Sequence, residues 1–495
     1  MSLALVHTRA RAGIAAPEVA VEVHLSNGLP SLNIVGLPET AVKESKDRVR
    51  SALLNAHFEF PRRRITVNLA PADLPKEGGR FDLAIAIGIL AASGQLPGDA
   101  LEAHELLGEL ALSGALRAIE GVLPAALAAT RAGRSLIVAA GNAPEAALAR
   151  DACVHGAGHL LEVCAHLRGE SRLEPHPYTP PQITVEGPDL DEVVGQHQVR
   201  RALEIAAAGG HNLLLSGPPG TGKTMLASRL PGILPPLDEA EAIEVAAIHS
   251  VAGLQREDFF RRPFRAPHHS ASPAALVGGG SLPRPGEISL AHCGVLFLDE
   301  LPEFPRRVLE VLREPLESGR VAIARVQSRI EFPARFQLIA AMNPCPCGYF
   351  GEARCRCTPD QIARYRARLS GPLQDRIDLQ VIAPRVAQTE LTQPASGEPS
   401  SAVRARVLAA RRRQTERQGG LNCTLSPAGL QRHCPLDLEQ RNLLNTAAER
   451  LGLSARAFHR LLRVARTLAD LDGSAHPGTE HLTEALGYRV ALTGR

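Results

Sequence analysis

The period of apolar and polar positions changes along the chain, and the changes predict regions of different fold. Two stretches in the first third, residues 19–36 and 62–74, alternate apolar and polar residues as half-buried strands do. Helical spacing follows over Thr40–Asn55, Phe81–Ala92 and Leu123–Ala132. This region is therefore expected to be an α+β domain.

The remaining two thirds divide into a strand-and-helix region and a helical region. In the middle of the chain, short apolar strands alternate with helices, which is typical of a parallel α/β sheet. The C-terminal part carries helical patterns and little strand signal, over Ser401–Gln418, Leu438–Leu451, Ser454–Leu471 and Thr479–Tyr488.

Two stretches of unusual composition mark the expected boundaries. Residues 171–188 hold five prolines and no apolar periodicity, and residues 388–401 are polar and contain no Lys or Arg. We expect an N-terminal domain over 1–170, a linker over 171–188, a central domain over 189–395 and a helical lid domain over 396–495.

Composition excludes several classes of protein. Hydrophobic residues make up 44% and charged residues 22% of the 495 positions, the profile of an ordinary globular protein. The longest apolar run, Leu83–Ala92, is too short to cross a bilayer, and Arg9 and Arg11 precede any stretch of signal-peptide length. We expect a cytoplasmic protein with no membrane partner. Nine cysteines, an odd number, indicate reduced thiols or a metal site rather than a disulfide framework.

Positive charge is concentrated near the C-terminus. Only four of the 55 basic residues are lysines, and residues 401–495 hold 15 Arg against eight acidic residues, which leaves +7 there although the whole chain carries +3. Such a module is either a partner for a polyanion or a helical region with an ordinary solvated face, and charge alone does not separate the two.

A phosphate-binding loop is the most specific motif in the chain. It matches GxxxxGK[ST] between an apolar strand over residues 212–215 and a helix expected from Met225. In such loops, backbone N–H groups surround phosphate oxygens, the lysine reaches the β- and γ-phosphates, and the last hydroxyl ligates Mg²⁺. A chance Gly-rich turn is the alternative. The loop comprises Gly217, Pro218, Pro219, Gly220, Thr221, Gly222, Lys223 and Thr224.

Two later strands end in polar residues that fit the same chemistry. Asp299 and Glu300 follow the apolar strand Val295–Leu298, and we expect Asp299 to hold Mg²⁺ and Glu300 to deprotonate the attacking water. Asn343 ends a third strand and is a candidate to position that water or to sense the γ-phosphate. Taken singly, these residues are as typical of turns and helix caps.

Together, GPPGTGKT, VLFLDE, AAMNP, GPLQDRIDL and SARAFHRLLRVART resemble the AAA+ ATPases, in the branch of magnesium chelatase motors and MCM helicases. The resemblance implies that Arg376 is the finger that reaches a neighbouring subunit's γ-phosphate and that Arg456 is the second sensor, from the helical lid. It also implies that Gly195 and Gln196 pack near the adenine.

Two insertions resemble features of the same branch. Residues 261–294, with His268 and His269, are similar to its helix-2 insert, and residues 320–336 are similar to its pre-sensor hairpin. The resemblance places both in the pore of a ring. Arg325 and Arg329 flank the hairpin tip, where they either grip DNA phosphates or protect a strand edge as solvated side chains.

The N-terminal domain resembles the Lon-type protease domain, of the ribosomal protein S5 domain 2-like fold, over about residues 19–140. The position of the Lon nucleophile holds Arg80 and the position of the Lon lysine holds Leu123. With neither a hydroxyl nor an amine there, we expect no protease activity. Lys76 lies in the same segment without an assigned role.

Four cysteines gather within 13 residues after Asn343, in the spacing CxC…CxC. They are candidates for a tetrahedral zinc site that staples the loop, although one intervening residue strains chelation and four idle thiols are the alternative. The candidates are Cys345, Cys347, Cys355 and Cys357.

Across almost its full length the chain resembles the ComM/YifB family. That resemblance implies an ATP- and Mg²⁺-dependent homohexameric motor that drives branch migration of forked or branched DNA in natural transformation and recombination, with recombination proteins as further partners. Composition and spacing alone reach only a ring NTPase. A magnesium-chelatase motor subunit, an ATP-dependent protease and a chaperone-like remodeller remain as alternatives.

Overall fold

A computed structural model describes residues 3–182, 187–256, 258–280, 283–324, 329–386, 389 and 397–490. The chain forms two compact units. Unit 1 comprises Met1–Gln182 and Ala242–Phe259, and unit 2 comprises Ile183–Glu241 and Phe260–Arg495. Helix α10 (Glu239–Val251) carries the chain from unit 2 into unit 1. The four segments expected from the sequence, with their boundaries, stay predictions.

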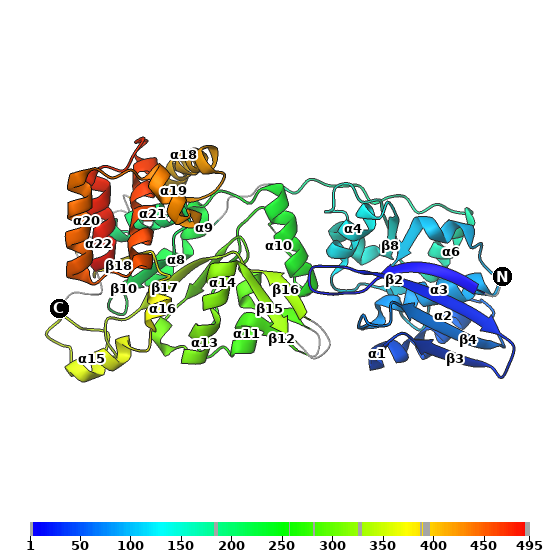
Figure 1. Cartoon of the computed structure of the whole chain (residues 1–495). Coiled ribbons are helices and arrows are strands. Elements are labelled where there is room, and N and C mark those ends of the chain that lie inside the picture. Colours follow the sequence, from blue (N-terminus) through cyan, green and yellow to red (C-terminus); the bar gives the residue numbers. More distant parts are fainter. Residues whose placement is uncertain are drawn as a thin grey trace. The chain divides into compact units, whose positions relative to one another are not determined.

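Unit 1 is built on a seven-stranded mixed sheet in the order β3-β4-β2-β1-β5-β8-β9 (Figure 1). Strands β1, β2 and β4 pair antiparallel, and the other neighbours pair parallel. The expected α+β character is confirmed. Its elements are β1 (Leu3–Arg9), β2 (Glu18–Ser26), β3 (Ser31–Val35), α1 (Thr40–Lys43), α2 (Ser45–Asn55), β4 (Arg64–Ala70), α3 (Asp82–Ala92), β5 (His104–Leu106), β6 (Glu109–Leu110), β7 (Leu116–Arg117), α4 (Val122–Arg131), β8 (Ser135–Ala139), α5 (Ala143–Ala146), β9 (Val154–Ala157) and α6 (Leu160–Arg168).

Helix α3 forms the centre of this unit's core because every one of its residues is buried. Its first residue, Asp82, accepts hydrogen bonds from Arg48 at 2.7 Å and from the Leu110 backbone at 3.3 Å. Burial raises the pKa of Asp82, and the bond from Arg48 opposes that shift. The helix dipole also stabilises a carboxylate at the helix N-terminus. Asp82 thus ties α3 to α2.

Unit 2 contains a five-stranded parallel sheet in the order β11-β14-β17-β10-β18. Because all strands run the same way, their carboxyl ends meet at one edge of the sheet and their amino ends at the other. The expected parallel α/β core is confirmed. The strands are β10 (Leu213–Ser216), β11 (Phe264–Arg265), β14 (Val295–Leu298), β17 (Gln337–Met342) and β18 (Leu379–Ile382).

Short helices and two hairpins connect these strands. The hairpin of β15 and β16 is antiparallel, with Ala324 opposite Arg329, as the sequence predicts. Arg325 and the rest of the expected tip lie outside the described residues. The elements are α7 (His197–Gly209), α8 (Lys223–Ser228), α9 (Leu230–Ile233), α11 (Pro273–Val277), β12 (Gly278–Gly279), β13 (Arg284–Pro285), α12 (Glu287–Leu290), α13 (Arg306–Val311), α14 (Arg313–Ser318), β15 (Arg320–Ala324), β16 (Arg329–Pro333), α15 (Pro359–Arg366) and α16 (Gly371–Gln374).

The C-terminal part is helical, as expected, and it packs on the sheet domain through α7 and β18. Helix α19 is not in the pattern-based prediction, because only seven residues between two prolines carry it. The elements are α18 (Ser400–Gln418), α19 (Pro427–His433), α20 (Leu438–Leu451), α21 (Ala455–Leu471) and α22 (Thr479–Val490).

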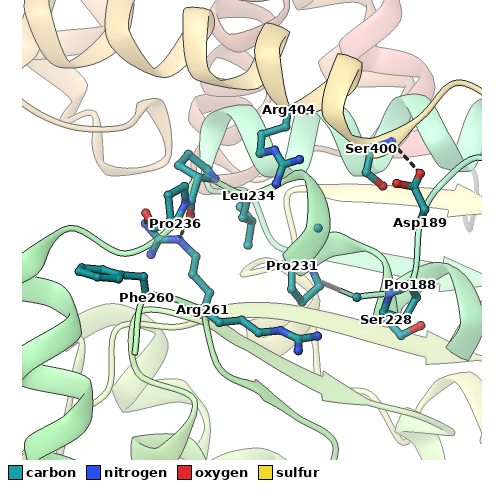
Figure 2. Close-up of a pocket in the computed structure, with 14 residues that line it drawn as sticks. Pro188, Asp189, Ser228, Pro231, Leu234, Pro236, Phe260, Arg261, Ser400 and Arg404 are labelled. Carbon is teal, nitrogen blue, oxygen red and sulfur yellow. Dashed lines mark hydrogen bonds between the residues drawn. The ribbon is translucent and has the colours of Figure 1, made fainter. Parts of the chain in front are cut away.

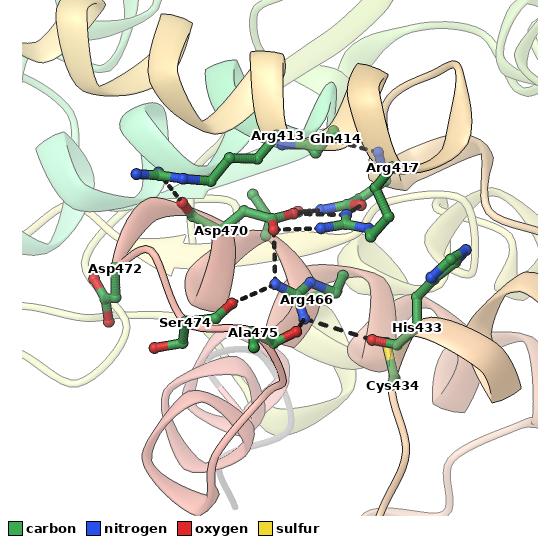
Figure 3. Close-up of polar contacts among 12 residues, drawn as sticks. Arg413, Gln414, Arg417, His433, Cys434, Arg466, Asp470, Asp472, Ser474 and Ala475 are labelled. Carbon is green, nitrogen blue, oxygen red and sulfur yellow. Dashed lines mark hydrogen bonds and ion pairs between the residues drawn. The ribbon is translucent and has the colours of Figure 1, made fainter.

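A buried polar network holds these helices together (Figure 3). Asp470 on α21 accepts hydrogen bonds from Arg417 at 2.6 Å, from Arg466 at 2.7 Å and from Asn422 at 2.8 Å. Burial raises the pKa of Asp470, but these hydrogen bonds outweigh it and hold the pKa below its usual range. Arg466 also donates to the Ala475 carbonyl at 2.7 Å. Part of the positive charge of this region is therefore neutralised inside it and is not available to a polyanion.

No helix among the described residues is long and apolar enough to cross a membrane.

Candidate nucleotide site

The phosphate-binding loop leaves β10 at the carboxyl edge of the unit 2 sheet and leads into α8. Gly220 and Gly222 have φ angles of 80° and 79°, which other residues rarely adopt. At Gly217 a Cβ atom would lie 2.4 Å from the Ala383 carbonyl oxygen, so the loop passes too close to β18 for a side chain. These glycines are required by the backbone, which argues against a chance Gly-rich turn.

Lys223 is buried at the centre of this loop. Its Nζ donates to the carbonyls of Gly217 at 2.7 Å and Pro218 at 2.9 Å, and it lies 3.3 Å from Asn343 Oδ1. Burial lowers the pKa of Lys223, and the carboxylates of Asp299 and Glu300 oppose that shift. The loop thus gathers a cation and a polar amide at one point.

Thr224 and Asp299 come from different elements and meet directly. The Thr224 hydroxyl donates to Asp299 Oδ2 at 2.5 Å, and Asp299 Oδ1 accepts from the Glu300 backbone at 2.9 Å. A hydroxyl and a carboxylate side by side are the oxygen donors that Mg²⁺ prefers, so the residues present fit this ion. Glu300 itself is exposed and has a φ of 49°.

The structure adds a residue to which the sequence assigns no role at this site. His269 Nδ1, in the segment expected to be a helix-2 insert, lies 3.4 Å from Glu300 Oε2. The rings of His268 and His269 are in contact, with centroids 4.1 Å apart and planes tilted by 34°. The double histidine is visible in the sequence, but nothing there relates it to a carboxylate some 30 residues later.

Gln196 reaches the same loop from the segment before α7. Its Nε2 donates to the Thr221 carbonyl at 3.4 Å and to the Pro384 carbonyl at 2.7 Å. Its Oε1 is buried and accepts no hydrogen bond from the described residues. Gly195 precedes it with a φ of 62°. Gln196 therefore lies against the phosphate-binding loop.

Arg376 and Arg456 lie at the other edge of the sheet. Arg376 precedes β18, is buried, and donates to the Pro372 carbonyl at 2.7 Å and to Glu317. Ser454, the N-cap of α21, lies 3.4 Å from Asp375, and the exposed Arg456 stands in the first turn of that helix. Within one chain, the two arginines are not brought together with the phosphate-binding loop.

Of the two arginines that flank the expected hairpin tip, the structure describes Arg329, which is exposed. Arg329 forms an ion pair with Glu331 at 3.2 Å on β16. An exposed pair of this kind contributes little to stability, so Arg329 is free to exchange partners.

The four cysteines of the loop after β17 form a cluster. Their sulfur atoms all lie within 4.8 Å of one another, and the residues are Cys345, Cys347, Cys355 and Cys357.

A separate small pocket lies where residues 187–189, the turn between α8 and α9 and the start of α18 meet (Figure 2). Asp189 Oδ1 accepts from the Ser400 backbone at 2.8 Å, and the Ser400 hydroxyl accepts from the Leu190 backbone at 2.8 Å. Among the described residues that line the pocket, none belongs to the phosphate-binding loop. The two hydrogen bonds attach the start of α18 to the segment before α7.

In unit 1, the positions that resemble the Lon catalytic pair are packed rather than open. Arg80 is buried, which lowers its pKa to about 10, and Leu123 is buried in the first turn of α4. Lys76 is fully buried and donates to the Pro71 carbonyl. The Lon likeness and the absence of protease activity stay predictions.

Known families and proteins match this chain over almost its whole length. Residues 189–391 match the family described as magnesium chelatase, subunit ChlI, residues 397–489 match the ChlI C-terminal family, and residues 21–142 match the family described as subunit ChlI of Mg-chelatase. The competence protein ComM of Haemophilus influenzae is 54% identical over 99% of this chain and 98% of its own length.

Two further relatives are similar to this chain, one over its full length and one over part of it. The YifB protein of Salmonella typhimurium is 55% identical over 99% of this chain and 97% of its own length. The magnesium-chelatase 38 kDa subunit of Rhodobacter capsulatus is 26% identical over 60% of this chain and 86% of its own length. The chain therefore belongs to the ComM/YifB family of magnesium-chelatase-like AAA+ proteins.

Proposed function

We propose that this protein is an ATP-hydrolysing ring motor that drives branch migration of DNA during natural transformation and recombination. The observation that carries the proposal is the full-length similarity to a competence protein, joined to a nucleotide site whose parts lie together. Membership of an AAA+ family suggests ATPase activity in its own right.

Each residue of the nucleotide site would have a separate role in ATP hydrolysis. Lys223 would leave its loop carbonyls for the β- and γ-phosphates, because phosphate oxygens are stronger acceptors for an ammonium. Asn343 would orient the attacking water, and Glu300 would take its proton. Thr224 and Asp299 would hold Mg²⁺, which when bound neutralises charge on the phosphates.

Two further contacts would involve nearby residues. His269 would hold the Glu300 carboxylate until water and nucleotide arrive, since the two side chains are 3.4 Å apart. The unsatisfied Oε1 of Gln196 would accept a hydrogen bond from the adenine amine, with Gly195 allowing the close approach. The zinc expected from the sequence would have a structural role in the cysteine loop and no part in hydrolysis.

A ring supplies what one chain lacks. Arg376 and Arg456 lie at the sheet edge opposite Lys223, so in a homohexamer both would reach the nucleotide of a neighbouring subunit. Arg376 would have to release Glu317 to do so. The hairpin of β15 and β16 would line the pore, where Arg329 exchanges Glu331 for DNA phosphates.

ATPase activity measured with and without a four-way DNA junction tests the proposal, with linear duplex as the comparison. We expect stimulation by the junction, and ATP-dependent conversion of the junction into duplex products. Glu300→Gln serves as a control that keeps the fold and removes turnover. ATPase activity that no DNA changes would favour the chelatase-like or chaperone-like alternative.

A further inference from the structure

The loop that follows Asn343 has a defined conformation without regular secondary structure. Residues 343–358 contain no helix or strand, yet their four cysteines converge from two ends of the loop. The Cys345 sulfur is 3.4 Å from the Cys347 sulfur and 3.9 Å from the Cys355 sulfur. The sulfurs of Cys347 and Cys355 are 3.7 Å apart. Cys345 is buried, and Cys347, Cys355 and Cys357 are partly exposed.

These separations match a metal site better than a disulfide. Zinc binds thiolates at about 2.3 Å in a tetrahedron, which sets neighbouring sulfurs about 3.8 Å apart. A disulfide needs about 2.05 Å, well below the shortest separation in the cluster. All nine cysteines are free thiols. Three of the sulfur atoms thus stand at separations close to those of a zinc site, and the Cys357 sulfur lies within 4.8 Å of each of them.

The backbone of the loop supports the same arrangement. Gly348 has a φ of 84°, and its N–H donates to the Cys345 carbonyl at 2.9 Å, which makes a tight turn between the first two cysteines and the rest of the loop. Backbone N–H groups of Tyr349 and Arg356 donate to the Cys347 sulfur. Hydrogen bonds to ligand sulfurs are a usual second shell of thiolate metal sites.

Apart from the cysteines, ring and ion-pair contacts also involve the loop. Arg354 lies over the Tyr349 ring at 3.8 Å, and Glu352 pairs with Arg354 at 2.7 Å and with Arg385 at 3.4 Å. These are partly exposed contacts of modest strength. A metal ion is one way to hold such a loop in a single conformation.

The loop rests directly on the nucleotide site. A Cβ atom at Gly348 would lie 2.6 Å from Pro219 Cδ of the phosphate-binding loop and 3.8 Å from Asn343 Cγ. Asn343 in turn lies 3.3 Å from Lys223. If the cysteine loop loosens, both Pro219 and Asn343 lose a packing surface, and the phosphate-binding loop becomes less preorganised.

We propose that Cys345, Cys347, Cys355 and Cys357 bind one zinc(II) ion and that the closed loop braces the ATP site through Gly348 and Pro219. The thiol protons leave to solvent when zinc binds, so binding weakens as the pH falls. The brace rests on the proposed ATP site, whereas the zinc site stands without it.

Metal content is the first test. Untagged protein purified without chelator should contain one zinc per chain. The pairs Cys345→Ser with Cys347→Ser, and Cys355→Ser with Cys357→Ser, should each abolish it, while Cys153→Ser, an exposed cysteine outside the cluster, should leave it unchanged. Cobalt(II) added to the chelator-treated protein should give the visible absorption of a tetrahedral thiolate complex. Wild-type protein without zinc and without this spectrum overturns the site.

Nucleotide affinity tests the brace. Chelator-treated wild-type protein should bind a fluorescent ATP analogue about tenfold more weakly, the order expected for loss of loop preorganisation, and zinc should restore binding. This reversible comparison needs no substitution, so misfolding of a variant does not enter it. Unchanged affinity after zinc removal overturns the brace and leaves the zinc site. Zinc-loaded protein that binds no nucleotide contradicts the proposed ATPase instead.

Discussion

Both edges of the unit 2 sheet hold charged side chains, but these differ in their hydrogen-bond partners. At the carboxyl edge, Lys223 donates hydrogen bonds to loop carbonyls and lies 3.3 Å from Asn343 Oδ1, and the exposed Glu300 has His269 as a near neighbour. At the amino edge, Asp378 is buried and accepts from the Asn212 backbone at 2.9 Å and from Arg460 at 2.7 Å.

On the proposed function, the difference separates groups that would bind the nucleotide from groups of the scaffold. Burial raises the pKa of Asp378, but His211 and Arg460 outweigh this and hold it far below its usual range, so the carboxylate is fixed in an internal pair. On the proposed function, phosphate and Mg²⁺ would replace the present partners of the groups at the carboxyl edge. Arg376 is the exception at the amino edge, because its partner Glu317 is exposed and can be exchanged. The four predictions below test this division.

The largest effect is expected at the carboxyl edge. Lys223→Ala removes the ammonium at the centre of the phosphate-binding loop, so ATP binding should be lost within the range that equilibrium titration can measure. Lys43→Ala, an exposed lysine of α1, is the matched control and should bind normally. Retained ATP affinity in Lys223→Ala would place the nucleotide elsewhere.

Arg376→Ala tests whether the amino edge acts on a neighbour. ATP should still bind, but hydrolysis should fall by roughly 10³–10⁵, the range seen for arginine fingers. Mixed with Lys223→Ala, which is also inactive, it should regain part of the ATPase activity, because some interfaces then pair an intact Arg376 with an intact Lys223.

The mixing experiment depends on subunit exchange, which native mass measurement detects directly. Mixed rings without recovered activity would show that Arg376 acts within its own subunit. That result would remove the main reason to regard the two edges as halves of one site.

Glu300→Gln keeps the volume and the hydrogen-bonding shape of the side chain but removes the base. Nucleotide should bind, and turnover should fall by about 10²–10⁴, the usual contribution of a general base. Glu303→Gln, three residues along and paired with Arg368 at 2.8 Å, is the control and should keep its activity. Single-turnover hydrolysis of bound ATP is the measurement; equal loss in both variants would contradict the assignment.

How far the sequence predicts this site depends on the distance over which each contact forms. The phosphate-binding loop and the strand before Asp299 are local patterns, and the structure has both at the expected residues. The four helices expected after residue 400 also appear within two residues of their predicted ends, since their apolar spacing and caps are local.

Contacts between distant segments are not predictable in this way. The approach of His269 to Glu300, the pair of Arg376 with Glu317 and the packing of Gly348 on Pro219 each join elements that only the folded sheet brings together. The expected single helix over residues 40–55 divides into α1 and α2 around Glu44. Helix propensity favours continuity there, and tertiary contacts around Ser45 and Asp82 decide otherwise.

The smallest expected effect concerns Glu317, the partner of Arg376. Glu317→Gln removes the charge that holds the guanidinium at the amino edge but keeps a side chain of the same size. Arg376 is buried but Glu317 is exposed, so solvent screens the pair from one side and its loss should raise the ATPase rate of the assembled ring by no more than about fivefold. Glu314 on the same helix is exposed too, and Glu314→Gln should leave the ATPase rate unchanged.

Added salt should reduce the difference in ATPase rate between wild-type and Glu317→Gln, because screening weakens the pair in the wild type. A lower rate in Glu317→Gln would mean that this carboxylate positions Arg376 for the nucleotide of the neighbouring subunit. The side chains of the amino edge would then be preorganised for the nucleotide, like those of the carboxyl edge.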